Sequence, residues 1–264
     1  MRKYMEIAVI YLKMQMFWRA DALFNVIFTI SKIIFAYLLW GILFQDSDTI
    51  AGFTFQSMLS YYIVSSFLSQ MEMSGGISNE ISTRIRNGTF SKYMVIPVNI
   101  EKYFIAMEIG TVGFHLIMNA FAAALWIFIF QIKFVFTTEY WVVLYAILMI
   151  MLGLLFMVQL NYYLGLLTLK YQEVSTFLMI KDNLVAFITG AIIPLALLPE
   201  TVIYFMKFFP FYYVTYLPAM LLTGHYEEQA LKGIFVLAGW CIFMELITGR
   251  VYEKYRRKFD GVGM

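Results

Sequence analysis

The sequence has few of the residues from which enzymes build reactive or metal-binding sites. Its 264 residues include one cysteine, Cys241, and two histidines, His115 and His225. A single cysteine excludes a disulfide within the chain, and one cysteine with two histidines leaves no obvious zinc site. We therefore expect no redox centre and no bound metal.

Charge is equally scarce. Charged residues make up 14% of the chain and hydrophobic residues 62%, a composition far from that of a soluble domain and typical of an integral membrane protein. The net charge of +2 comes from short basic clusters beside apolar runs, which indicates anchoring at a membrane surface and not nucleic-acid binding. The phosphate-binding pattern G-x-x-x-x-G-K-S/T does not occur, so the chain offers no nucleotide loop of that kind.

Six apolar stretches are long enough to cross a bilayer, since about 20 helical residues cover its hydrocarbon core of roughly 30 Å. The expected spans are residues 22–44, 53–73, 103–130, 140–164, 177–198 and 230–248. Residues 1–20 precede them, and Glu6 and Lys13 interrupt their apolar run without a small-residue cleavage site. We expect this segment to form a helix that lies at the cytosolic interface.

Basic residues fall almost entirely on one side of these spans. Fifteen of the nineteen Lys and Arg residues lie on the side of the two termini. Lys133, Lys207 and Lys232 lie on the other side, and Lys32 lies inside the first span. By the positive-inside rule, both termini are expected in the cytosol and the chain in the cell membrane.

The apolar stretch 199–224 is expected to be a re-entrant outer hairpin and not a seventh span. Pro194, Pro199, Pro210 and Pro218 remove backbone donors and disfavour one unbroken helix. A seventh span would also export the basic stretch 250–258. The predicted fold is thus an all-α integral membrane protein, with residues 1–264 forming one domain of six transmembrane helices.

The longest polar stretch is the cytosolic loop 78–97, between the second and third spans. Ser78 or Asn79 is expected to cap a helix of about two turns, and Gly88 to close it. Glu80 suits the positive end of that helix, and Arg84 and Arg86 suit its negative end.

The order Asn79-Glu80, Arg84, Arg86, Asn87-Gly88-Thr89 and Pro97 resembles the first cytosolic loop of ABC type-2 exporter permeases, in which this segment is the coupling helix. The prolines between 190 and 218 and the six spans with both termini inside are similar to the same family. Arg84 and Arg86 have an alternative interpretation, in which they only anchor a turn to lipid headgroups. The residues that the resemblance assigns to ATPase coupling are Asn79, Glu80, Arg84, Arg86, Asn87 and Gly88.

The resemblance implies that the chain is half of a pore in a bacterial cell membrane. It would pair with a second permease subunit, identical or, slightly favoured, non-identical, and be driven by a separate ATP-binding subunit. ATP and Mg²⁺ would bind on that partner, because this chain lacks the nucleotide motif and is expected to be no enzyme and to bind no cofactor.

Polar residues inside the spans are candidates for lining a conduit. Lys32 lies near the middle of the first span, where a charge costs about 2.5–3.5 kcal/mol, so its side chain should face protein or water unless it snorkels. The second span is rich in serine and tyrosine and should not face lipid all round. If the resemblance holds, the second span faces the fifth span across the conduit, and helix packing is the alternative. His115 could likewise be a proton relay or a packed side chain. The candidates are Lys32, Tyr61, Tyr62, Ser65, Ser66, Ser69, Asn183 and Phe187.

Three functions are considered. The first is a permease subunit that exports an amphipathic compound, which could be lipid-like, a peptide, drug-like or a glycan. The second is an intramembrane lipid-modifying enzyme, which would need a nucleophile with a base or paired carboxylates at membrane depth, and no convincing set occurs. The third is a non-transporting scaffold or sensor in contact with membrane lipid and other proteins.

Overall fold

The structure is a computed structural model that describes residues 2–17, 19–72, 74–131, 133–171, 173–189 and 195–256. Within these residues every regular element is a helix, and Ile50 and Phe53 form an isolated bridge. The prediction of an all-α fold is confirmed. In the described part of the chain, three helical stretches are long and apolar enough to cross a membrane: Ile100–Leu125, Tyr140–Tyr171 and Glu227–Arg256. Ile30–Leu43 is a shorter apolar stretch.

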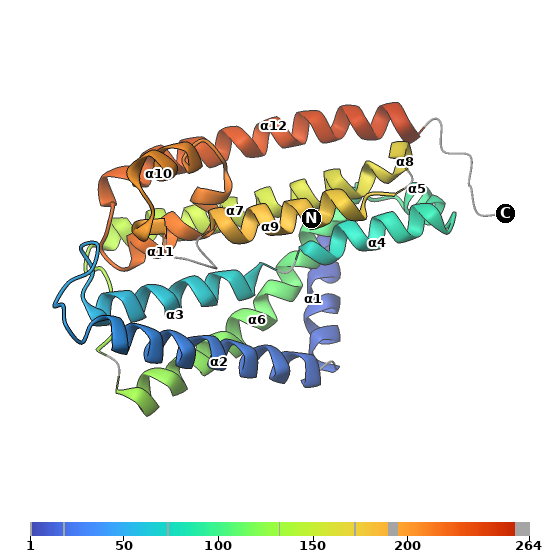
Figure 1. The fold of residues 1–264 in the computed structure, drawn as a ribbon. Helices are drawn as coiled ribbons and strands as arrows, with labels where there is room; N and C mark the ends of the chain where they lie inside the picture. The colour runs from blue at the N-terminus through green and yellow to red at the C-terminus, as the bar shows by residue number, and fades with distance from the viewer. Residues whose placement is uncertain are drawn as a thin grey trace.

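The helices run mostly along one direction, with α1 lying across the others (Figure 1). A helix occupies each stretch in which a span is expected, although residues 190–194 of the fifth stretch, with Pro194, lie outside the described part. Short 3-10 turns at Leu195–Leu197 and Glu227–Gln229 and a π-helical turn at Tyr212–Tyr216 connect the later helices. The α-helices are α1 (Arg2–Phe17), α2 (Arg19–Leu43), α3 (Phe55–Met71), α4 (Gly75–Arg86), α5 (Ser91–Val95), α6 (Ile100–Phe130), α7 (Tyr140–Leu166), α8 (Thr168–Tyr171), α9 (Ser175–Ile188), α10 (Glu200–Met206), α11 (Leu217–Leu222) and α12 (Ala230–Arg256).

Helix α7 lies at the centre of the packing and contacts α12, α4 and α11. Two glycines allow its close approaches. A Cβ at Gly153 would lie 3.2 Å from Val214 Cα, and a Cβ at Gly233 of α12 would lie 2.7 Å from Met149 Cε. Around these contacts the core is aromatic and aliphatic, which suits helices that pack inside a bilayer by van der Waals contact.

The stretch 199–224 bends back on itself. Pro199 is the N-cap residue of α10, and the chain turns before the buried Pro210. Pro218 lies in the first turn of α11, which continues directly from the π-helical turn Tyr212–Tyr216. Residues 217–221 of α11 are all buried, and α11 contacts α7 and α3. The stretch therefore forms two short helices, and neither is long enough to span a bilayer.

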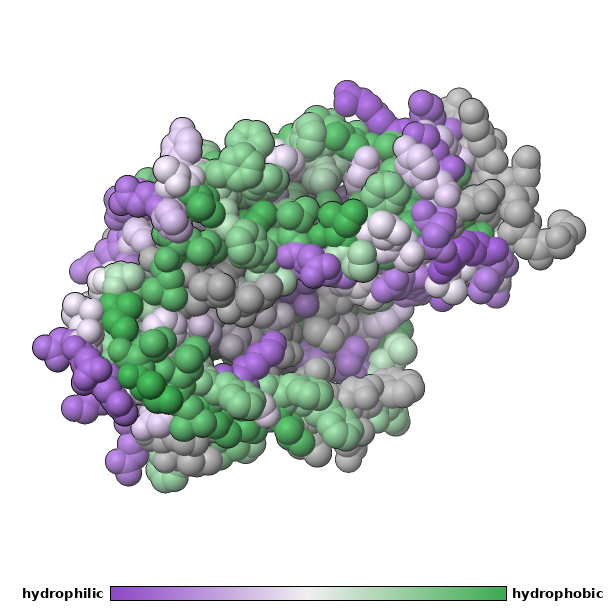
Figure 2. All heavy atoms as spheres, in the orientation of Figure 1, coloured by the Kyte–Doolittle hydropathy of each residue, from purple (hydrophilic) through white to green (hydrophobic). Residues whose placement is uncertain are grey.

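Two polar ends flank an apolar middle. We call the end that carries α4, α5 and α8 the α4 end, and the opposite end, with α10 and the turn between α2 and α3, the α10 end (Figure 1). Figure 2 shows most hydrophilic side chains gathered at these two ends and mainly hydrophobic ones, with a few hydrophilic ones, between them. Such a distribution supports a membrane protein whose helices run from one polar end to the other.

Helix α1 packs across α6. A Cβ on Gly110 would collide with the backbone oxygen of Ala8, so a larger residue there would separate the two helices. The hydroxyls of Tyr11 and Tyr103 lie 2.8 Å apart, and Lys3 Nζ donates to the Pro97 carbonyl at 2.7 Å. Apolar side chains such as Met5, which is 70% exposed, stay on the outer face of α1.

Candidate functional site at the α4 end

Helix α4 begins earlier than the sequence predicts. Ser74 is its N-cap residue, and twelve residues from Gly75 to Arg86 are helical. Ser78 lies inside the helix, where its hydroxyl donates to the Gly75 carbonyl at 2.9 Å. The expectation that Ser78 or Asn79 caps a two-turn helix is therefore wrong. Gly88 has φ +68° in the left-handed region, as a glycine that closes a helix should.

The reason for the early start is packing. Ile77, Ile81 and Ile85 recur every four residues and are buried, so α4 presents an apolar stripe to α7 over its whole length. At Gly165 of α7 the two helices touch, because a Cβ there would lie 2.9 Å from Ile81 Cβ and 3.2 Å from Ser78 Cα. Helix α4 is thus seated on α7 and is not a free surface turn.

Glu80 and Arg84 are joined in a cluster within the chain. Glu80 accepts hydrogen bonds from Arg84 Nε at 3.0 Å and from the Tyr93 hydroxyl at 2.7 Å. The Arg84 guanidinium lies 4.9 Å from the centre of the Tyr93 ring. Burial and the hydrogen bond to Glu80 raise the pKa of Tyr93, so its hydroxyl stays protonated and keeps donating. The cluster ties α4 to α5.

Asn79, Arg86 and Asn87 lie on the exposed side of α4. Arg86 pairs with Glu173 at 2.9 Å, and Glu173 lies in the turn before α9. The backbone N–H of Ser175 donates to Glu173 and lowers the pKa of its carboxyl, with its hydroxyl and Arg86 acting in the same direction. The six predicted coupling residues thus divide into Glu80 and Arg84, which bond internally, Gly88, which ends the helix, and three that face outward.

A buried polar chain connects the start of α4 with α7 and α9. Asn161 of α7 donates to Ser74 Oγ at 2.8 Å and accepts from Lys181 Nζ of α9 at 3.0 Å. Ser74 also donates to the Glu72 carboxylate, through its backbone N–H at 3.0 Å and through its hydroxyl. Lys181 is 9% exposed and pairs with the exposed Asp182 at 2.6 Å. The start of α4 is therefore linked to α9 through hydrogen-bonded side chains.

Sequence reasoning missed Asn161 and Lys181 as parts of one network. A signal existed, because Asn161 and Gln159 are the two amides in the otherwise apolar α7. Polar side chains in such a helix usually hydrogen-bond to a neighbouring helix. The partner could not be named, since Lys181 lies on another helix and its burial follows only from the packing.

The conduit candidates separate into buried and exposed groups. Tyr61 and Ser65 of α3 are buried in the bundle, and the Tyr61 ring lies 5.9 Å from that of Tyr216. Tyr62 and Ser66 are half-buried. The exposed members are Ser69, Lys32 on α2, and Asn183 and Phe187 on α9. His115 is buried in α6.

No group of three or more His, Cys, Asp or Glu side chains in the described part of the chain is placed to hold a metal ion. At the α4 end a short helix packs against α7 and is tied to α5, and the side chains of Asn79, Arg86 and Asn87 are exposed.

A family model described as an ABC-2 family transporter protein matches residues 30–263. The match begins inside α2, so it leaves out α1 and includes α4, the hairpin and α12. Searches of curated proteins and of solved structures found no match.

Proposed function

This chain belongs to the ABC-2 family of transporters, and we propose that it is the membrane-spanning permease subunit of an ATP-driven exporter. A permease of this family is a transport membrane domain and not itself a catalytic enzyme, and it generally pairs with an ATP-binding subunit. ATP and Mg²⁺ would bind on that partner and not on this chain.

The observation that carries the proposal is the seating of α4. A coupling helix must receive a push from an ATP-binding subunit and pass it on without bending away. The contact of Ile81 with Gly165 and the Glu80–Arg84–Tyr93 cluster hold α4 from two directions. Asn79, Arg86 and Asn87 would be the contacts with the partner, and the Ser74–Asn161–Lys181 chain would carry motion to α9.

In the proposed topology α2, α3, α6, α7, α9 with the residues that follow it, and α12 are the six spans. The α4 end is cytosolic, with both termini, and the α10 end faces outward with its re-entrant hairpin. Support comes from the positions of Lys and Arg along the sequence and from the polar ends in Figure 2.

A second permease subunit would complete the pore, and we slightly favour a non-identical one. Helix α9 leaves Leu184 and Phe187 exposed at 45% and 44%, with Asn183 beside them. Together with the exposed Lys32 of α2 they would face the partner permease or the conduit. An apolar wall with occasional polar groups suits an amphipathic cargo, and outward transport is the direction that we propose.

The test is co-purification. Tagged full-length chain is isolated from its native membranes, and ATP-binding proteins that accompany it are identified and assayed for ATP hydrolysis. Wild type is expected to bring one such subunit. The double change Asn79→Ala with Arg86→Glu is expected to lose it, whereas Lys133→Ala, an exposed change between α6 and α7, is expected to keep it. Absence of any ATP-binding protein with wild type would favour a scaffold or sensor.

A further inference from the structure

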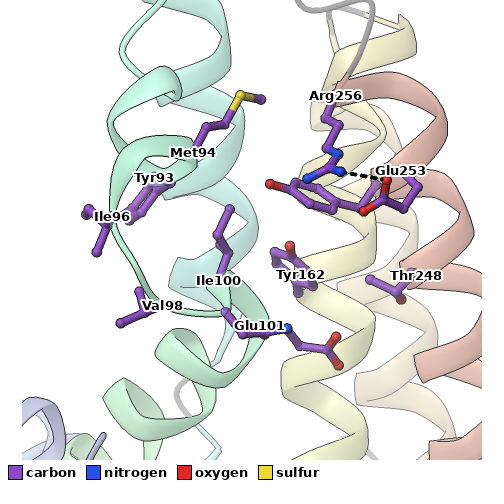
Figure 3. A pocket seen from close by; sticks show the side chains of 13 residues that line it. Tyr93, Met94, Ile96, Val98, Ile100, Glu101, Tyr162, Thr248, Glu253 and Arg256 are labelled. Atoms are coloured by element: carbon purple, nitrogen blue, oxygen red, sulfur yellow. Dashed lines mark ion pairs between the residues drawn. The ribbon is translucent and has the colours of Figure 1, made fainter. Parts of the chain in front are cut away.

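A second site lies at the α4 end, away from the outward edge of α4. A pocket of about 370 Å³ opens between α5, the start of α6, α7 and the last turns of α12 (Figure 3). Thr248, Tyr252 and Arg256 recur every four residues along α12 and line one wall. Glu101 of α6 and Tyr162 of α7 point into the same space. The volume is near the lower limit for small-molecule sites, which suits a headgroup and not a whole lipid.

The charges of the pocket call for a cation. Its charged lining residues are Glu101, Glu253 and Arg256. Glu253 pairs with Arg256 at 2.8 Å, whereas Glu101 has no ion-pair partner among the described residues and accepts a hydrogen bond from the Gln159 side chain. Burial makes the charged form of Glu101 costly, and the neighbouring Lys102 offsets this cost only in part. The ring of Tyr162 adds a face that attracts an ammonium group, whereas the Tyr252 ring already lies 5.5 Å from the Arg256 guanidinium.

Thr248 points independently to a ligand. Its side chain is 1% exposed, and its Oγ1 has no hydrogen-bond partner in the described part of the chain. A buried hydroxyl left without a partner costs about 1–3 kcal/mol. Thr248 lines the pocket, but its Oγ1 is closed off from the open space, so a bound group reaches this hydroxyl only after a small rotation of the side chain.

The rim of the pocket favours a lipid over a soluble amine. Val95, 83% exposed, and Ile96, 43% exposed, stand at the end of α5, and Ile96 also lines the pocket. Exposed aliphatic residues at a polar end of a membrane protein are suited to the boundary between headgroups and acyl chains. A headgroup could enter the pocket while its acyl chains remain outside along this rim.

We propose that this pocket binds the phosphoethanolamine headgroup of an aminophospholipid from the leaflet at the α4 end. The ammonium group lies at Glu101, near Thr248 and the Tyr162 ring, and the phosphate approaches Arg256, which also pairs with Glu253. The site is separate from the surface of α4 that is proposed to contact the ATP-binding subunit, and it does not depend on that contact.

The test is a titration of delipidated full-length chain, followed by native mass spectrometry. One molecule of short-chain phosphatidylethanolamine is expected to bind to each protein chain. Glu101→Gln is expected to weaken binding at least tenfold and Thr248→Val several-fold, and the control Glu200→Gln, an exposed change on α10, is expected to bind as wild type does. If Glu101→Gln does not purify as a folded protein, Thr248→Val alone decides.

Three results would overturn the proposal. If phosphatidylglycerol, which has the phosphate and no amine, binds as tightly as phosphatidylethanolamine, the ammonium assignment is wrong. If free ethanolamine displaces the lipid at equal concentration, the ligand is a soluble amine. If lipid binding is unchanged in a folded Glu101→Gln variant or in Thr248→Val, this pocket is not the lipid-binding site. Co-purification of an ATP-binding subunit should be unaffected by either change, so this failure is distinguishable from failure of the proposed function.

Discussion

Replacing Gly165 with alanine tests whether α4 is seated on α7. The added Cβ would lie 2.9 Å from Ile81 Cβ and 3.2 Å from Ser78 Cα. Neither atom is the end of a flexible side chain, so α4 as a whole must move. Overpacking of this kind costs about 1–3 kcal/mol.

The matched control is Gly239→Ala in α12, where a Cβ meets nothing within 4 Å. Both changes gain about 1 kcal/mol of helix propensity, which cancels in the comparison. For a chain of this size 1 kcal/mol shifts Tm by about 2–4 °C, so Gly165→Ala is expected to melt about 2–12 °C below Gly239→Ala. The assay is thermal unfolding of both purified variants in one detergent. Equal Tm values would refute the seating of α4.

Three further predictions concern packing and charge. Asn161→Leu should destabilise the chain by about 1–3 kcal/mol, and adding Lys181→Met should recover part of that loss, which a double-mutant cycle of thermal unfolding measures. Gly110→Ala should loosen α1 from α6, so limited proteolysis should cleave α1 faster than in wild type. The pKa of Glu173 is lowered, so Glu173 and its ion pair with Arg86 stay charged at every pH above the ordinary carboxyl range. The pair is lost only as the pH falls through that lowered pKa. Partner binding should therefore not change between pH 8 and about pH 5, which pull-downs across this range would check.

Helical class and the placement of helices could be predicted because both depend on local pattern. The apolar stretch beginning at Tyr140, for example, is a helix to Leu166. The start of α4 could not be predicted, since Ser78 is a good cap by residue type, and only its burial against α7 shows that the helix already runs through it. Tertiary packing overrode the local capping preference.

The face on which a polar residue lies was beyond sequence reasoning. Tyr61 and Tyr62 are adjacent, yet one is buried in the bundle and the other half-exposed. Glu80 and Arg84 had the spacing of an ion pair along one helix face, and the structure adds Tyr93 from α5 as the third member. Contacts between helices, such as that of Asn161 with Lys181, depend on a packing that no local pattern encodes.

The central claim is that the exposed edge of α4 contacts an ATP-binding subunit. A photo-crosslinking amino acid placed at Asn79 in the full-length chain, irradiated in native membranes, tests it most directly. We predict a crosslink between that position and an ATP-binding protein, and none from Thr138, an exposed residue just before α7. The opposite pattern, with crosslinks from Thr138 and none from Asn79, would contradict both the coupling role of α4 and the proposed orientation.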